Sequence, residues 1–131
     1  MKTILITGAG RGIGYSLPKL YIQSNFTVIA ISRNTEQLKS LKANNLKILP
    51  YDLVNEYDLV LKSIDSLNFQ IDILINNAGV LINKSLLDTL DSDINYVIET
   101  NLIVPFKLIR DLFSKLNYGS HIVNIGSMGG F

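Results

Sequence analysis

Residues 3–14 read TILITGAGRGIG, in which a short apolar run leads directly into four alternating glycines. The run from Ile4 to Ile6 predicts a buried strand, and the glycines lie where this strand would pass into a helix. A glycine-rich turn at the start of a helix presents bare backbone N–H groups where the helix dipole is positive. The segment therefore predicts an anion-binding site that is open enough for a pyrophosphate.

Three glycines of this loop have separate roles in such a site. Gly8 makes the tight turn after the strand, Gly12 lets the main chain approach a pyrophosphate, and Gly14 lets the helix pack close to the strand. The spacing is G-x-x-x-G-x-G rather than G-x-G-x-x-G. A purely structural turn is the alternative interpretation, because a glycine-rich turn by itself is weak evidence for a binding site.

Strand-like and helix-like segments alternate along the rest of the chain. Four more short runs rich in β-branched residues predict buried strands: Val28 to Ile31, Leu46 to Leu49, Ile71 to Ile75, and Ile122 to Ile125. The helical segments between them begin after candidate N-caps, namely Thr35, Asn55 and the cluster at residues 91–93. This alternation predicts βαβ units, and hence a parallel sheet with helices on both faces.

The composition indicates a single domain, residues 1–131, with one hydrophobic core. The 12 Lys and Arg against 11 Asp and Glu give a net charge of +1, which argues against a nucleic-acid partner. Because cysteine is absent and no metal ligands cluster in the sequence, we expect no disulfide and no metal site, and a cytoplasmic location. The apolar runs are far too short for a membrane span, so no membrane partner is expected.

Polar residues follow all five predicted strands, and the carboxyl ends of parallel strands border the ligand crevice in sheets of this kind. These residues are Thr7, Ser32, Asp52, Asn76 and Ser127. Ser32 takes the position where an NAD-specific site ends its second strand with an acid. Arg11 and Arg33 could together bind a 2′-phosphate, which favours NADP(H) over NAD(H) as the cofactor. Two solvated surface arginines are the alternative.

Two motifs resemble the short-chain dehydrogenase/reductase family. Residues 7–14 match its T-G-x-x-x-G-x-G loop, and residues 76–79 match its N-N-A-G segment. The resemblance implies the α/β fold class, with a Rossmann-type doubly wound sheet of strand order 3-2-1-4-5. It also implies hydride transfer between NAD(P) and a small carbonyl or alcohol substrate, and the chain is expected to form a homo-oligomer. Residues 101–105 and 127–130 are similar to a carbonyl-reductase branch that includes C-factor-like proteins.

The motifs and the strand ends together assign the cofactor-binding residues. They are Thr7, Gly8, Arg11, Gly12, Ile13, Gly14, Ser32, Arg33, Asp52, Leu53, Asn76, Asn77, Ala78 and Gly79. The resemblance implies that Asp52 accepts a hydrogen bond from the adenine amino group, although an aspartate here is also a common turn residue or helix cap. Asn76 would lie beside the adenosine ribose or brace the sheet, and both roles remain open.

Asn101 and Ser127 match the family's catalytic asparagine and serine. The resemblance implies that the Asn101 carbonyl holds a water in a proton relay, and Pro105 has no N–H to donate to that carbonyl. An ordinary proline kink is the alternative. Ser127 would hydrogen-bond the substrate oxygen and stabilise the oxyanion-like transition state. His121 is predicted to have a surface or packing role, and Tyr96 and Tyr118 are predicted to be packing or rim residues.

The family's reaction also needs a Tyr-x-x-x-Lys pair. The pair with this spacing, Tyr15 and Lys19, lies in the first predicted helix and is rejected as the catalytic dyad. Proton transfer is typically worth about 10²- to 10⁴-fold in rate, so the chain as given resembles an amino-terminal half without efficient activity. A non-catalytic dinucleotide-binding module and a truncated fragment are the alternative functions. The fifth strand is expected at an uncovered sheet edge, which predicts self-association.

Overall fold

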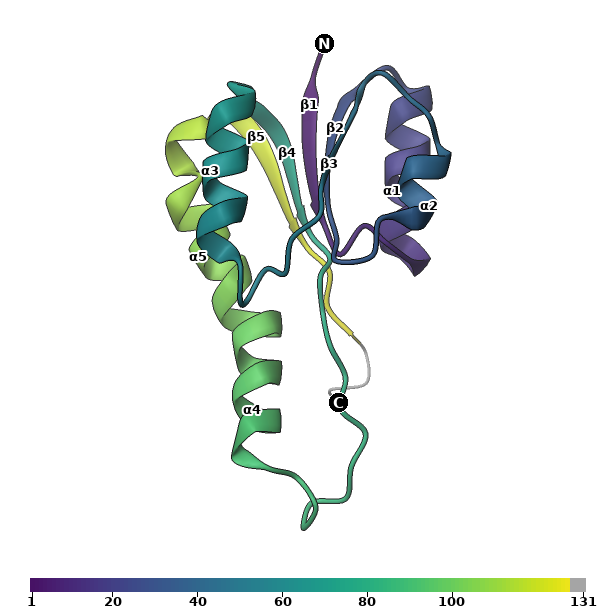
Figure 1. Cartoon of the computed structure of the whole chain (residues 1–131). Helices are drawn as coiled ribbons and strands as arrows, with labels where there is room; N and C mark the ends of the chain where they lie inside the picture. The colour runs from purple at the N-terminus through teal and green to yellow at the C-terminus, as the bar shows by residue number, and fades with distance from the viewer. Residues whose placement is uncertain (128–131) are drawn as a thin grey trace.

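A parallel sheet forms the centre of the protein in the computed structural model, which describes residues 1–127 (Figure 1). Its strands are β1 (Thr3–Thr7), β2 (Thr27–Ile31), β3 (Leu46–Leu49), β4 (Ile71–Asn76) and β5 (Leu116–Asn124). They lie in the order β3-β2-β1-β4-β5, and every neighbouring pair is parallel. The predicted Rossmann-type strand order is thereby confirmed.

Helices cover both faces of this sheet. The α-helices are α1 (Gly12–Gln23), α2 (Glu36–Ser40), α3 (Tyr57–Leu67), α4 (Asp91–Ile98) and α5 (Val104–Asp111), with a π-helix η1 (Glu99–Ile103) and a 3-10 helix η2 (Phe113–Lys115). Figure 1 shows α1 and α2 on one side of the sheet and α3 and α5 on the other, with α4 extending past the ends of the strands. None of the helices in residues 1–127 is both long and apolar enough to cross a membrane.

The core consists of two apolar layers because successive side chains of a strand point to opposite faces. Leu5 and Ile29 pack in one layer with residues of α3 and α5 such as Leu108. Ile4 and Val28 pack in the other layer, next to α1 and α2. All residues of β1 and β2 are buried, as expected for central strands covered on both faces.

Several predicted boundaries are wrong by a few residues. The fifth strand begins at Leu116 rather than Ile122, and its register with β4 shifts between Ile71 and Ile73. Gly119 of this strand has a positive φ and no side chain, so it does not extend the apolar run by which the strand was predicted. As β5 is an edge strand of the described sheet, self-association remains a prediction.

Two of the predicted helix caps are also shifted by one residue. The N-cap of α3 is Glu56 rather than Asn55, and that of α4 is Leu90, just before the predicted cluster. The Asp93 carboxylate accepts the Leu90 N–H at 3.0 Å, so the acidic cluster still stabilises the start of α4. Thr35 is the N-cap of α2, but its side chain makes no capping bond. Instead, the Asn34 side chain accepts the Glu36 N–H at 3.1 Å.

The helical segment before Pro105 is interrupted, as its sequence predicts. Residues 99–103 form the π-helix η1, in which the Val104 N–H bonds to the Glu99 carbonyl five residues earlier. Pro105 then lies in the first turn of α5. Since proline has no N–H for the Asn101 carbonyl, it breaks the α-helical pattern at that residue. The interruption is a π-helical turn rather than a simple kink.

Candidate functional site

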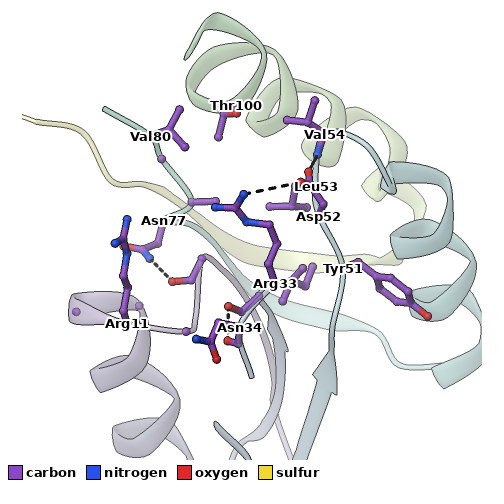
Figure 2. A pocket seen from close by; sticks show the side chains of 18 of the residues that line it. Arg11, Arg33, Asn34, Tyr51, Asp52, Leu53, Val54, Asn77, Val80 and Thr100 are labelled. Carbon is purple, nitrogen blue, oxygen red and sulfur yellow. Dashed lines mark hydrogen bonds and ion pairs between the residues drawn. The ribbon is translucent and has the colours of Figure 1, made fainter. Parts of the chain in front are cut away.

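An open cleft of about 910 Å³ lies at the carboxyl ends of the strands (Figure 2). Segments far apart in sequence meet there: the glycine loop, the residues after β2, β3 and β4, and one side of α4 and η1. Most of the predicted cofactor-binding residues line it, namely Gly8, Arg11, Gly12, Ile13, Gly14, Ser32, Arg33, Asp52, Leu53, Asn77, Ala78 and Gly79. The volume is within the usual range for a small-molecule site.

The glycine loop leaves the start of α1 open to this cleft. Helix α1 begins at Gly12, and its N-cap, Arg11, makes no side-chain capping bond. Gly12 has a φ of +56°, and a Cβ placed on it would meet no atom within 4 Å. The first N–H groups of a helix have no partner inside the helix and favour anions. The backbone around Gly12 therefore fits a diphosphate group.

Gly14 has the packing role that its position predicts. A Cβ on Gly14 would collide with the Gly8 carbonyl oxygen and with Nδ2 of Asn77. The Asn77 amide nitrogen donates to the carbonyl oxygens of Thr7 and Gly8, at 3.2 and 3.1 Å. Helix, glycine loop and the segment after β4 are thus in direct contact, which explains why this position requires a residue without a side chain.

Thr7 supports the site from beneath rather than lining it. Its side chain is buried, and its hydroxyl oxygen accepts the backbone N–H groups of Asn77 and Ala78, at 3.0 and 2.9 Å. These bonds fix the N-N-A-G segment against the end of β1. Thr7 does not line the cleft, so its predicted cofactor contact gains no support from the geometry.

Arg33 reaches across the cleft from the end of β2. Its Nη1 lies 4.0 Å from Oδ2 of Asp52, an ion pair drawn in Figure 2, and donates to the hydroxyl of Tyr96 at 3.3 Å. The Arg33 side chain is 65% exposed. Arg11 also lines the cleft but makes no ion pair within residues 1–127, so both predicted arginines border the same space.

Asp52 caps the turn that precedes α3. Its Oδ1 accepts the N–H groups of Val54 and Asn55, at 2.8 and 3.1 Å. Partial burial tends to raise the pKa of this carboxyl group, but the two N–H donors, the Asn55 amide and Arg33 outweigh burial and lower the pKa below its ordinary value. Asp52 is therefore a charged cap that also lines the cleft, so the structure supports its predicted capping role and leaves the adenine contact a prediction.

Asn76 lies behind the cleft wall and joins two strands. Its Nδ2 donates to Oδ1 of Asn124 at 2.8 Å, which links β4 to β5. Its own Oδ1 is buried and has no hydrogen-bond partner within the described chain. Asn76 does not line the cleft, so this geometry favours the bracing role over contact with a ribose.

Asn101 ties the π-helix to the segment after β4. Its side-chain oxygen accepts the Val80 N–H at 2.8 Å, and its Nδ2 donates to the Val80 carbonyl at 2.9 Å. The side chain thus pairs with both polar groups of one backbone unit, while its own backbone lies in the π-helical turn. Ser127 is exposed, three residues beyond the end of β5. Neither residue lines the cleft itself.

The cleft is also lined by residues that the sequence patterns did not assign to it, namely Gly10, Ile31, Asn34, Glu36, Gln37, Tyr51, Val54, Val80, Tyr96 and Thr100. Gly10 belongs to the glycine loop, and a Cβ there would collide with Oγ of Ser32. A glycine at this position of the loop is therefore a sequence signal that could have placed Gly10 in the cleft. Tyr96 was predicted only as a packing or rim residue, and Thr100 gave no signal, because both are far from the glycine loop in sequence. Residues 1–127 contain no cluster of three or more metal-ligating side chains.

Comparison with known proteins agrees with this arrangement. The family model for short chain dehydrogenase matches residues 2–131. The ketoacyl reductase HetN of Nostoc sp. is 34% identical over 98% of this chain and 48% of its own length. The 3-oxoacyl-[acyl-carrier-protein] reductase FabG of Rickettsia prowazekii is 35% identical over 98% of this chain and 55% of its own.

A solved structure of 4-hydroxyisoleucine dehydrogenase complexed with NADH superimposes with a TM-score of 0.89. It is 33% identical in sequence and is matched over 99% of this chain and 56% of its own. The chain therefore spans about half the length of the proteins that it resembles. The family model, the sheet order and the glycine loop agree, and the chain belongs to the short chain dehydrogenase family.

Proposed function

We propose that the cleft binds a nicotinamide dinucleotide, with NADP(H) preferred over NAD(H), and that the protein transfers a hydride to or from a small carbonyl or alcohol compound. Membership of an oxidoreductase family supports the reaction class. The observation that carries the proposal is the open start of α1 at Gly12, where uncapped N–H groups border the cleft.

The preference for NADP(H) rests on the charges around the cleft. Arg11 and Arg33 both line it, and Ser32 stands where an acid would otherwise accept a bond from a ribose hydroxyl. A guanidinium forms charge-assisted hydrogen bonds with phosphate oxygens, so these side chains suit a 2′-phosphate. The structural relative solved with NADH shows only what that protein binds.

The remaining chemistry is assigned to two residues. The dinucleotide, when bound, supplies or accepts the hydride. Asn101 fixes Val80 beside the cleft through its side chain. We assign the bound water to its main-chain carbonyl, to which Pro105 has no N–H to donate. Ser127 follows β5, and we assign its hydroxyl to the substrate oxygen, where a donor would stabilise developing negative charge.

Two glycine variants test the binding site. Gly12 and Gly119 both have positive φ, and neither would bring a Cβ within 4 Å of another atom, but only Gly12 lines the cleft. Gly12→Ala and Gly119→Ala should therefore lose similar stability, about 1 kcal/mol, through backbone strain. Isothermal titration calorimetry should show weaker NADPH binding for Gly12→Ala alone. Failure of the unmodified protein to bind either dinucleotide at millimolar concentration would refute the proposal.

Arg33→Asp tests the cofactor preference. We expect the unmodified protein to bind NADPH at least about tenfold more tightly than NADH, because one charge-assisted contact contributes about 1.5 kcal/mol or more. Arg33→Asp should remove or reverse this ratio. Arg110→Asp changes the net charge equally at an exposed position outside the cleft and is the control. An unchanged ratio in Arg33→Asp would show that Arg33 does not select the cofactor.

A further inference from the structure

Arg33 is held from two other elements of the fold, and the two contacts have different chemistry. The Asp52 carboxylate approaches from the segment after β3, and the Tyr96 hydroxyl approaches from α4. Arg33 itself follows β2. A long, exposed side chain in solution otherwise populates many rotamers, so these contacts define where the guanidinium lies.

The Asp52 contact opposes the capture of a phosphate. The Asp52 carboxylate is ionised at neutral pH, since its pKa lies below the ordinary value for an aspartate despite partial burial. A carboxylate 4.0 Å from the guanidinium neutralises part of its charge, and it repels an incoming phosphate at the same place. Asp52 therefore orients Arg33 but lowers the affinity of Arg33 for anions.

The Tyr96 contact has the opposite effect. The Tyr96 oxygen accepts a hydrogen bond from Nη1 of Arg33 at 3.3 Å, so it orients the guanidinium without cancelling its charge. Within α4, Tyr96 is the residue that lines the cleft, so this helix reaches the site through that side chain.

We propose that Tyr96 is a positioning residue for Arg33, which holds the guanidinium over the cleft and thereby sets the preference for a dinucleotide that carries a 2′-phosphate. The Asp52 carboxylate limits this preference because it repels the phosphate. The inference deepens the proposed function and rests on it. It assigns a specificity role to α4, a helix that is remote in sequence from the glycine loop.

We predict that two substitutions change the ratio of NADPH affinity to NADH affinity in opposite directions. Tyr96→Phe should weaken NADPH binding about threefold and leave NADH binding unchanged, because one exposed hydrogen bond to a charged group is lost. Asp52→Asn should raise the preference for NADPH, since the neutral amide still accepts N–H bonds in the turn but no longer repels phosphate. If Asp52 also contacts the adenosine part of the cofactor, the substitution would change the affinities for NADPH and NADH equally. Such a change would leave the ratio of the two affinities unaltered.

A double-mutant cycle separates positioning from a general structural role. Binding of NADPH and NADH is measured by calorimetry for the unmodified chain, Tyr96→Phe, Arg33→Ala and the double variant. Tyr96→Phe should have no further effect when Arg33 is already alanine. Tyr118→Phe, at a fully exposed position outside the cleft, is the matched control and should change nothing.

Each other result overturns a defined part of the argument. Equal weakening of both dinucleotides by Tyr96→Phe, or an equal loss in the Arg33→Ala background, would make Tyr96 a structural residue and overturn the positioning role. An Arg33-dependent preference that Tyr96→Phe leaves intact would overturn this inference alone. A chain that binds neither dinucleotide would overturn the proposed function and this inference together. A chain that binds both without any contribution from Arg33 would overturn the NADP(H) preference and this inference, but not dinucleotide binding.

Discussion

The two regions that border the cleft differ in how firmly the core holds them. The packed sheet, meaning β1, β2 and the helices against them, has strands that are buried at every residue. The outer segment, residues 81–98, contains α4, none of whose residues is buried. Exposed leucines at residues 81, 86 and 87 precede that helix. The outer segment meets the cleft through polar contacts such as Tyr96 with Arg33, so we expect it to affect binding more than stability.

The largest contrast should come from removing an apolar side chain in each region. Leu108 of α5 is fully buried in the core, whereas Leu86 of the outer segment is 89% exposed. Leu108→Ala should lower the free energy of unfolding by about 2–5 kcal/mol through lost packing and a cavity. Leu86→Ala should change it by less than about 0.5 kcal/mol. Urea denaturation monitored by circular dichroism compares them, and equal losses would mean that the outer segment is part of the core.

A smaller effect is expected where the glycine loop meets α1. Gly14→Ala improves helix propensity, but its new Cβ collides with backbone and with Asn77. We expect a net loss of about 1–3 kcal/mol, as for other overpacked sites. Gly126→Ala is the control, because a Cβ there meets no atom within 4 Å. A Gly14→Ala variant as stable as Gly126→Ala would mean that the loop is less tightly packed than described.

The pH dependence of stability tests the link between β1 and β5. Asp72 accepts the Thr3 N–H at 2.7 Å and the Asn117 amide at 2.8 Å. The Thr3 bond is the main reason why the pKa of Asp72 is below its ordinary value, with Asn117 adding to it, so the stabilisation is present above the pKa of the unfolded chain, about 3.9. It disappears as the pH falls through the lower pKa of the folded state.

Asp72→Asn should therefore cost about 1 kcal/mol at neutral pH and less in acid. Unfolding curves between pH 7 and pH 3 measure this difference. Asp58→Asn, at an exposed position of α3, is the control for the change of charge. A loss from Asp72→Asn that does not shrink on acidification would show that the carboxylate charge contributes nothing.

The smallest change is expected to be a gain. Thr100 lies in the π-helix beside the cleft, is 6% exposed, and has a hydroxyl oxygen without a hydrogen-bond partner in the described chain. Thr100→Val removes this unsatisfied group with little change in shape, so stability should rise by up to about 1 kcal/mol. Thr89→Val removes a hydroxyl that does bond, to the Ser85 carbonyl, and should not stabilise. A clear loss for Thr100→Val would imply that its hydroxyl is satisfied in solution.

Local patterns predicted most of the fold. The strands at Ile4, Val28, Leu46 and Ile71 were predictable because each is a short apolar run between helical segments. The start of β5 was not, because residues 116–121 are mostly polar and pair with β4 only through a shifted register. The shifted N-caps reflect competition among neighbouring polar side chains for the same N–H groups, which sequence preferences do not resolve.

The amino-acid sequence by itself determined the parallel sheet and the glycine loop at the start of α1, because strand alternation, helical spacing and glycine placement act between near neighbours. Only the tertiary structure decided which polar residues face the cleft. Thr7 and Asn76 support it from behind, whereas Tyr96 reaches into it. Their hydrogen-bond partners lie about 50 to 70 positions away in the chain, so the contacts exist only after the sheet has brought those segments together.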